Sequence, residues 1–449
     1  MGKHRRYEGK SGIPRRDFLK LLGAGAASVG TGSLVGFTPV AYPADPITIN
    51  WVVWSYSVET ILDNIRKFEA EYQNRIKVNL TDFSWNAYHE TIVNRLHSRT
   101  PTDILYNGGN WLPEMVRAGW VVPLDDYFPA VTKYKEKIVG YALEDMTYQG
   151  KLYGLPYYAD ITSFQYNEKL LKDYGINRPP ETWEEVTDQS KFLQKKGMEF
   201  PVVLELAQSL PTTHDNFSAM VFGRGEDLVD EHDEPLFAHP KSAAWQQLQW
   251  LAKARNTDKI MTYLPHETDV QKAMNTGRHV FTVLYNYNLA ALNNKAVSPL
   301  AGQFKIGLMP GQAHATFGFC RFYCMTKMAT ERGPAVLDAL WKFLEYFGGE
   351  YKGEYVVAKR WAVEKGLGFG QLPLWDDPEV VDTFARWIDV DMLKRQQALA
   401  RKRHETVWYG IWGEFFRIQL MRAVAGEASV EEALEAAANK WNQLKKQFS

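Results

Sequence analysis

The sequence predicts an α/β protein that contains a doubly wound parallel sheet and at least two domains. Uncharged, β-branched segments alternate along the chain with segments whose apolar residues recur at helical spacing, which is typical of βαβ units. About 405 residues follow an N-terminal targeting segment, more than a single hydrophobic core usually supports. No internal repeat, low-complexity tract or long linker interrupts the alternation.

The first 44 residues have the layout of an export signal. Seven Lys and Arg residues against two acidic ones precede an uncharged run from Leu21 to Ala44. Residues 15–20 read Arg-Arg-Asp-Phe-Leu-Lys, which resembles the twin-arginine export motif. Five glycines dilute the uncharged run, so we favour a cleaved signal peptide at 1–44 over a membrane anchor. We therefore expect a soluble, periplasmic protein.

Charge and cysteine content exclude several classes of protein. Removing residues 1–44 changes the formal net charge from −1 to −6, and a mildly acidic chain without basic runs disfavours nucleic acid as a partner. Cys320 and Cys324 lie on a predicted strand at 317–326, where four residues span roughly 13 Å, too far for a disulfide. Neither has a nearby His, so we expect no metal site and no cofactor.

The individual elements are predicted in order along the chain. Strands are expected at 47–53, 76–80, 103–106, 163–166, 280–284, 304–308 and 317–326. Helices are expected around 61–72 and at 86–97, 334–347, 379–395, 406–424 and 430–446. Thr182-Trp-Glu-Glu185 and Ser429-x-x-Glu432 have the pattern of capping boxes, each of which opens a helix.

Six ordered stretches carry a resemblance to a known family. They are AGWVVPLDDY at 118–127, GKLYGLPY at 150–157, YNEKLL at 166–171 leading into PPETWEE at 179–185, AMNTGR at 273–278, GLMPG at 307–311 and GEASVEEAL at 426–434. Together they resemble the sugar-binding, maltose-binding-protein-like family of extracellular solute-binding proteins that serve ABC transporters. One departure is the stretch 317–322, Phe-Gly-Phe-Cys-Arg-Phe, where the family often has consecutive glycines.

The resemblance implies a periplasmic-binding-protein-like fold with two discontinuous lobes and a multi-segment hinge. The lobes would be 45–159 with 309–355, and 160–308 with 356–449. Closure of the hinge around a ligand is the expected motion. The implied function is that of a monomeric, non-enzymatic binding component of an ABC importer, with a sugar as ligand and the membrane permease subunits as partners.

Aromatic and polar residues follow three predicted strands, at the edge where α/β sheets bind ligands. These candidate ligand-binding residues are Trp54 and Tyr56 after strand 47–53, Asn107, Asn110 and Trp111 after strand 103–106, and Tyr285 and Tyr287 after strand 280–284. An aromatic ring stacks on the C–H face of a sugar, while amide and phenol groups match its hydroxyls. Ordinary core packing is the alternative for Trp54, Trp111 and Tyr287.

The resemblance adds further candidates. Asp160 aligns with a ligand-binding acid of the family, and Tyr158 lies in the segment just before it. An ion pair at the hinge is the alternative role for Asp160. Trp408 and Trp412 fall in a region that the family uses for ring stacking, although an inward-facing stripe on helix 406–424 explains them equally well.

Two other classes of function remain open. A ligand other than a sugar is possible: a polyol, a phosphorylated polyol or a betaine-like compound held in an aromatic cage. The absence of a convergent Arg and Lys set at the strand ends weakens the phosphate version. A periplasmic carbohydrate-active enzyme would need two carboxylates on either side of one bond, whereas the adjacent acid pairs of this sequence stand in turn and capping contexts.

Overall fold

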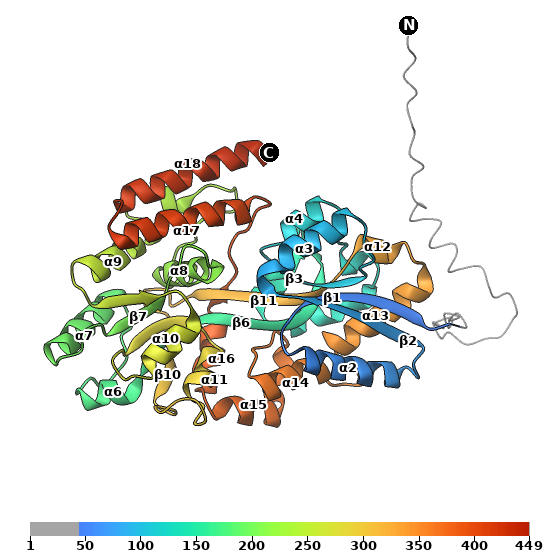
Figure 1. Ribbon diagram of the computed structural model, residues 1–449, viewed down its shortest axis with the longest axis horizontal. Helices are drawn as coiled ribbons and strands as arrows, with labels where there is room; N and C mark the ends of the chain where they lie inside the picture. Colours follow the sequence, from blue (N-terminus) through green and yellow to red (C-terminus); the bar gives the residue numbers. More distant parts are fainter. Residues whose placement is uncertain (1–44, 449) are drawn as a thin grey trace, which may run out of the picture. The chain divides into compact units, whose positions relative to one another are not determined.

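A computed structural model describes residues 45–448, so the predicted signal peptide at 1–44 lies outside the described residues. Strands and helices alternate along this range, as the sequence predicts (Figure 1). The strands are β1 (Ile47–Trp54), β2 (Ile76–Phe83), β3 (Ile104–Gly108), β4 (Thr147–Tyr148), β5 (Lys151–Leu152), β6 (Gly154–Asn167), β7 (Val202–Glu205), β8 (Met261–Leu264), β9 (Phe281–Tyr285), β10 (Phe304–Gly307), β11 (Thr316–Met325) and β12 (Ala400–Arg401).

The α-helices cover most of the remaining chain. They are α2 (Val58–Glu71), α3 (Trp85–His97), α4 (Leu112–Arg117), α5 (Gly140–Asp145), α6 (Glu168–Asp173), α7 (Trp183–Lys195), α8 (Pro211–Arg224), α9 (Ala243–Asn256), α10 (Glu267–Met274), α11 (Asn288–Leu292), α12 (Lys327–Thr330), α13 (Pro334–Phe347), α14 (Val356–Lys365), α15 (Pro378–Ala385), α16 (Val390–Ala398), α17 (Tyr409–Ala425) and α18 (Val430–Phe448). Within residues 45–448, none of them is both long and apolar enough to cross a membrane.

One sheet runs through the described chain in the order β2-β1-β3-β11-β6-β9-β7-β8. β1, β2 and β3 are parallel and form its first half, while β7, β8 and β9 are parallel and form its second half. β11 and β6 are the central pair and are antiparallel to each other; β11 is also antiparallel to β3, and β6 to β9. The parallel halves confirm the predicted doubly wound sheet.

The register of the central pair brings the two halves together at one point. The end of β3 pairs with β11 at Gly108 and Arg321, and Arg321 pairs in turn with Tyr158 of β6. From the opposite direction, β9 ends where Tyr285 pairs with Thr162 of β6. The carboxyl ends of strands from both halves therefore converge on residues 158–162, as ligand sites in α/β sheets require.

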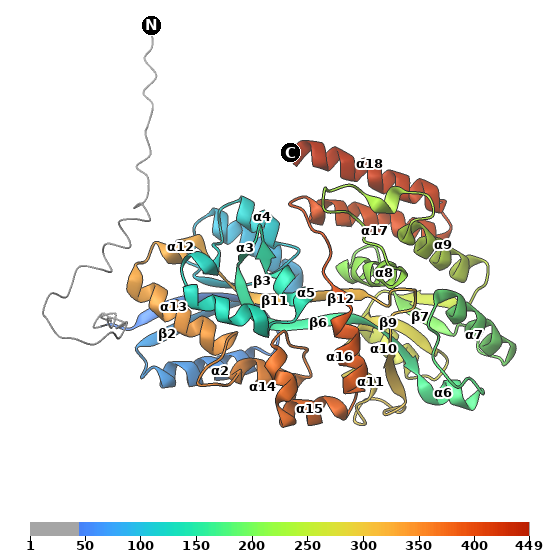
Figure 2. The ribbon, with the colours of Figure 1, turned by 180° about the vertical axis from the view of Figure 1, so that it is seen from behind.

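Helices cover both faces of the sheet, and two hydrophobic cores hold them there. In both views α3, α4, α8, α17 and α18 lie above the sheet, and α2, α14, α15 and α16 lie below it (Figures 1 and 2). The first core contains Trp51, Tyr106 and Trp361, and the second contains Trp183 and Trp441. Burying large aromatic side chains such as these stabilises each layer by about 2–3 kcal/mol per residue.

The two hydrophobic cores do not follow the predicted lobe boundaries throughout the chain. β6 runs unbroken through residues 159 and 160. Trp361 of α14 and Phe384 of α15 belong to the first core, although they follow residue 355. The boundaries of the two predicted lobes therefore stay a prediction.

The helix ends agree with the sequence in part. Ser429 and Glu432 form the predicted capping box: the Ser429 hydroxyl accepts from the Glu432 N–H at 3.1 Å, and the Glu432 carboxylate accepts from the Ser429 N–H at 2.8 Å. Thr182 also caps its helix. The single helix predicted at 379–395 is wrong, because Asp389 caps a new helix by accepting from the Met392 N–H at 3.0 Å, which separates α15 from α16.

The cysteines follow the prediction. Cys320 and Cys324 both lie on β11, are fully buried and are free thiols. Burial raises the pKa of both, that of Cys324 to about 12. The uncharged thiol is therefore the stable form, and both residues act as small apolar side chains.

Candidate ligand-binding site

The candidate site is the point where the strand ends converge. We call it the junction and define it by Trp85, Trp111, Tyr158, Tyr285, Tyr287 and Arg321. Trp85, which opens α3, is 44% exposed despite its size. The other five are half-buried, so each keeps part of its surface open to a ligand. Five of the six side chains are aromatic, and they come from both halves of the sheet.

Ring contacts connect these aromatic residues. The ring centroids of Trp85 and Trp111 lie 5.5 Å apart, and those of Tyr285 and Tyr287 lie 5.7 Å apart. Phe319 of β11 connects Tyr158 to the tyrosine pair, at 5.9 Å from Tyr158 and 5.0 Å from Tyr285. These spacings are those of favourable aromatic pairs, so the junction is a preformed set of rings.

Arg321 occupies the middle of this set. Its guanidinium lies 5.6 Å from the ring centroid of Trp85, 5.7 Å from that of Trp111 and 5.2 Å from that of Phe319. Its Nη1 donates to the side-chain oxygen of Asn110 at 2.9 Å. Burial opposes the charge, but the phenols of Tyr158 and Tyr285 and two nearby carboxylates together hold the pKa of Arg321 above its ordinary value.

A second buried arginine is already neutralised by acids. Arg403 makes ion pairs with Asp215 of α8 and with Glu405, the latter at 2.9 Å, and all three side chains are less than a tenth exposed. The phenol of Tyr285 donates to the other oxygen of the Asp215 carboxylate. The contacts of Arg403 and Tyr285 with Asp215 therefore anchor the segment after β12 to the second half of the sheet, directly beside the junction.

Asp160 lies at the centre of β6 and is fully buried. Its carboxylate accepts from the backbone N–H of Ile161 at 2.8 Å and from that of Tyr287 at 3.3 Å. Among residues 45–448 it makes no ion pair, so the alternative of an ion pair at the crossing is not seen. Burial raises its pKa to about 7, and repulsion from Glu267 adds to the rise.

The loop around Gly368 covers Asp160. A β-carbon at Gly368 would lie 2.2 Å from the Ala159 carbonyl and 3.1 Å from the Asp160 carboxyl carbon, so only glycine allows this close approach. The Asp160 carboxylate is therefore not accessible to a ligand in this conformation.

Two further acids lie near the tyrosines after β9, Glu267 beside Tyr287 and Glu205 close enough to influence Tyr285. The Tyr287 phenol donates to Glu267 at 2.8 Å. Glu205, at the end of β7, accepts from the Thr212 hydroxyl at 3.0 Å and is nearly fully buried. Burial and repulsion from Glu267 raise the pKa of Glu205 to about 7. Of these two acids, Glu267 is partly exposed and is the oxygen acceptor that this side of the junction offers to hydroxyl groups.

The residues after β1 and β3 lie at different depths. Trp54 is 5% exposed and packs against Tyr106 at a centroid distance of 4.6 Å, so it belongs to the core wall behind the junction. Asn107 is fully buried, and its side-chain oxygen accepts from the Gly108 N–H at 2.9 Å. Tyr56, in contrast, is 40% exposed and lies 6.0 Å from Trp361.

The structure does not bring Trp408 and Trp412 to the junction. Trp412 is fully buried, stacks on Phe416 at 4.7 Å and donates its indole N–H to the Ala437 carbonyl at 2.9 Å. Trp408 lies 5.7 Å from Trp441 in the same core. Their contacts are those of the inward-facing stripe on α17, the alternative that the sequence left open.

Comparison with known proteins identifies the family. Residues 54–312, more than half of the chain, match the family model of bacterial extracellular solute-binding proteins. The chain belongs to this family. The diacetylchitobiose binding protein DasA of Streptomyces coelicolor is 24% identical over 73% of this chain and 76% of its own length. A Brucella abortus binding protein is 28% identical over 37% of this chain, and the match spans only 41% of that relative.

Solved structures of binding proteins share the fold. Maltose-bound MalE3 of T. maritima has a TM-score of 0.73 at 18% identity, over 89% of this chain and 100% of that chain. A Thermotoga lettingae solute-binding protein with bound α-D-tagatose has a TM-score of 0.71 at 21% identity, over 89% and 99% of the two chains. The predicted periplasmic-binding-protein-like fold is therefore confirmed.

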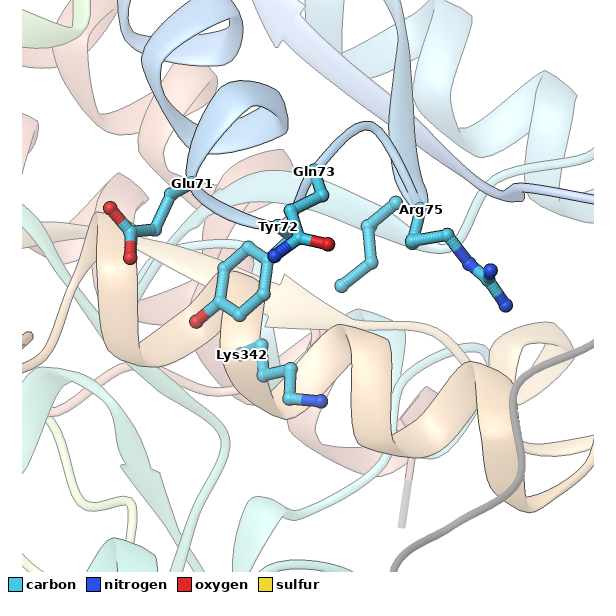
Figure 3. A pocket seen from close by; sticks show the side chains of 6 residues that line it. Glu71, Tyr72, Gln73, Arg75 and Lys342 are labelled. Carbon is cyan, nitrogen blue, oxygen red and sulfur yellow. The ribbon is translucent and has the colours of Figure 1, made fainter.

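One surface hollow of this solute-binding protein lies away from the junction. It measures about 390 Å³ and is lined by Glu71, Tyr72, Gln73, Arg75, Ile76 and Lys342, where α2 leads into β2 beside α13 (Figure 3). No strand of the sheet ends there at its carboxyl end, and Tyr72 is the only ring in the lining. We therefore place the candidate site at the junction, where rings and polar groups converge.

Sequence reasoning missed several residues of the junction. Trp85 lies between a predicted strand and a predicted helix, as the candidate residues at the other strand ends do. Arg321 is a charged residue inside an otherwise apolar strand, which was a usable signal. Nothing local marks Asp215 and Arg403, because 188 positions of chain separate them. Among residues 45–448, no three His, Cys, Asp or Glu side chains are placed to hold a metal ion.

Proposed function

We propose that this protein is the exported binding component of an ABC importer and that it captures a sugar or oligosaccharide at the junction. The observation that carries the proposal is the convergence of partly exposed rings and polar groups from both halves of the sheet on one point of β6. The family supports the role, and relatives named for diacetylchitobiose, arabinooligosaccharide and maltotriose support the ligand class.

The proposed contacts divide by chemistry. Trp85, Trp111 and Tyr287 would stack on the C–H faces of sugar rings, while Asn110, Tyr158 and Tyr285 would bond hydroxyls. Asp160 would join them once the Gly368 loop has moved. β6 and β11 cross between the two halves of the sheet, so bending of these strands would close the halves over the ligand.

A polyol is the second candidate ligand. Structures of solute-binding proteins from Agrobacterium vitis S4 with D-mannitol and from Agrobacterium radiobacter K84 with ribitol share the fold, with TM-scores of 0.65 and 0.69. An open-chain polyol offers the same hydroxyls as a sugar but no ring face. Stacking residues should therefore matter less for a polyol than for a sugar.

The test is a ligand screen on the purified mature protein. Neutral and acidic mono- and disaccharides, mannitol, ribitol and glycine betaine are compared by thermal shift and then by calorimetry. A ligand at a hundred times its Kd stabilises the folded state by about 2.7 kcal/mol. Trp111→Ala should weaken binding of the best sugar tenfold or more. Trp120→Ala, at a control tryptophan in the turn after α4, should leave binding unchanged. Failure of every carbohydrate and polyol to bind would refute the proposal.

Export is tested separately. Residues 1–44 fused to a reporter that is active only when exported folded should give periplasmic activity, and Lys at both Arg15 and Arg16 should abolish it. Equal export of the double variant would refute the twin-arginine route while leaving the binding role untouched.

A further inference from the structure

Arg321 is the one charged side chain of the junction, and most of its hydrogen-bond donors are unused. Within residues 45–448 it makes no ion pair; its Nη1 donates to the neutral amide oxygen of Asn110, and the Tyr158 phenol is also within hydrogen-bonding reach of the guanidinium. Its buried Nε has no hydrogen-bond partner. A guanidinium has five N–H donors in a planar fork, so most of them remain for a ligand.

The acids near Arg321 are held by other groups. Asp215 and Glu405 are in direct contact with Arg403. Asp145 accepts from the Cys320 N–H at 2.8 Å, and its largest attraction to a cation is to Lys402. Asp145 and Asp215 therefore attract the Arg321 guanidinium from a distance without bonding to it. No carboxylate of the described residues occupies its planar fork, which leaves the fork open to an anionic ligand.

The surroundings of the fork fit a carboxylate on a ring. Trp85 and Trp111 flank the guanidinium. His89 stacks on Trp111 at 5.0 Å, so the exposed ring of Trp85 offers the larger surface to a sugar. A carboxylate is planar and carries one charge, which matches one guanidinium with two parallel hydrogen bonds. A phosphate dianion would need more cations, and the carboxylates of Asp145 and Asp215 are close enough to Arg321 to repel it.

We propose that the junction selects acidic sugars, and that Arg321 binds the carboxylate of a uronic acid unit between Trp85 and Trp111. The hydroxyls at the other end of the sugar would face Tyr287 and its partner Glu267. This inference rests on the proposed function and names the ligand class of the same site.

The experiment compares matched pairs of ligands that differ at one carbon. Calorimetry on the purified protein measures D-glucuronate against D-glucose and D-galacturonate against D-galactose, which differ only at C6, with glucose 6-phosphate as the phosphate arm. We expect a uronate to bind at least tenfold more tightly than its neutral counterpart. Tighter binding of glucose 6-phosphate than of glucuronate would overturn the choice of a carboxylate.

Variants separate the role of Arg321 from effects on folding. Arg321→Gln should weaken binding of the uronate ten- to a hundredfold and change binding of the neutral sugar less than threefold. Arg321→Lys keeps the charge without the fork and should fall between the two, which provides a second measurement if the Gln variant does not fold. The control is Arg95→Gln, a half-buried arginine on α3 that donates to the Pro101 carbonyl and makes no ion pair within residues 45–448.

The outcomes distinguish the two proposals. Equal binding of uronates and neutral sugars, or binding of neutral sugars alone, overturns the acidic-sugar proposal and leaves the proposed function in place. Equal losses for both ligands in Arg321→Gln overturn the role of the guanidinium. Binding of no carbohydrate at all overturns both proposals together.

Discussion

Asp160→Asn should remove much of the pH dependence of stability in the ligand-free protein. The Asp160 carboxyl is fully buried, and burial raises its pKa from an ordinary 3.8 to about 7. Each pH unit of difference corresponds to about 1.4 kcal/mol, so ionising Asp160 in the folded state costs about 4 kcal/mol more than in the unfolded chain.

The sign follows from proton binding. Between about pH 4 and pH 7 the folded state holds a proton on Asp160 that the unfolded chain has already lost. The free energy of unfolding therefore falls as pH rises through this window and levels off above it. Asparagine is neutral at every pH and similar in shape, and its side-chain oxygen can still accept from the Ile161 N–H.

The assay is thermal unfolding of both proteins from pH 4 to pH 8. At roughly 2.1 cal/mol/K per residue, a chain of about 400 residues has an unfolding entropy near 0.85 kcal/mol/K, so about 4 kcal/mol corresponds to about 5 °C in Tm. The wild type should lose about 5 °C more than Asp160→Asn across this range. Some dependence should remain in the variant, because the pKa of Glu205 is also raised to about 7.

Asp173→Asn is the matched control, since Asp173 is an exposed acid in a surface ion pair with Lys169. Its Tm curve should run parallel to that of the wild type. Parallel curves for wild type and Asp160→Asn would show that Asp160 ionises in the folded protein as it does in water, and would refute the reasoning.

Two further predictions concern groups outside the ligand contacts. Cys320 and Cys324 should resist alkylation in the native protein at pH 8 and should both react after unfolding, with no mass change on reduction; a disulfide in the mass spectrum would contradict their placement on one strand. Arg403→Met leaves Asp215 buried without its cation and should lower the free energy of unfolding by about 3–5 kcal/mol, whereas Arg178→Met at a surface pair should change it by less than about 1 kcal/mol. Equal effects in urea unfolding would contradict the burial argument.

The features that the sequence determined by itself are local ones. The strand β1, the helix α13 and the capping box of α18 could be predicted because their signals lie within one element. Periodicity and caps act between residues a few positions apart, so no tertiary information is needed. The separation of Cys320 from Cys324 follows in the same way from the rise of a strand.

The charge and exposure of the candidate site were decided only by the tertiary structure. Arg321 meets Asn110 across 211 positions of chain, and the indole of Trp412 meets the Ala437 carbonyl on another helix. Whether an aromatic ring faces a ligand or a core, and whether an acid holds its proton, depends on how many groups from distant segments surround it. The sequence could therefore locate the strand ends of the junction, but the burial that neutralises Asp160 and leaves Arg321 without an anion arises only when those segments pack together.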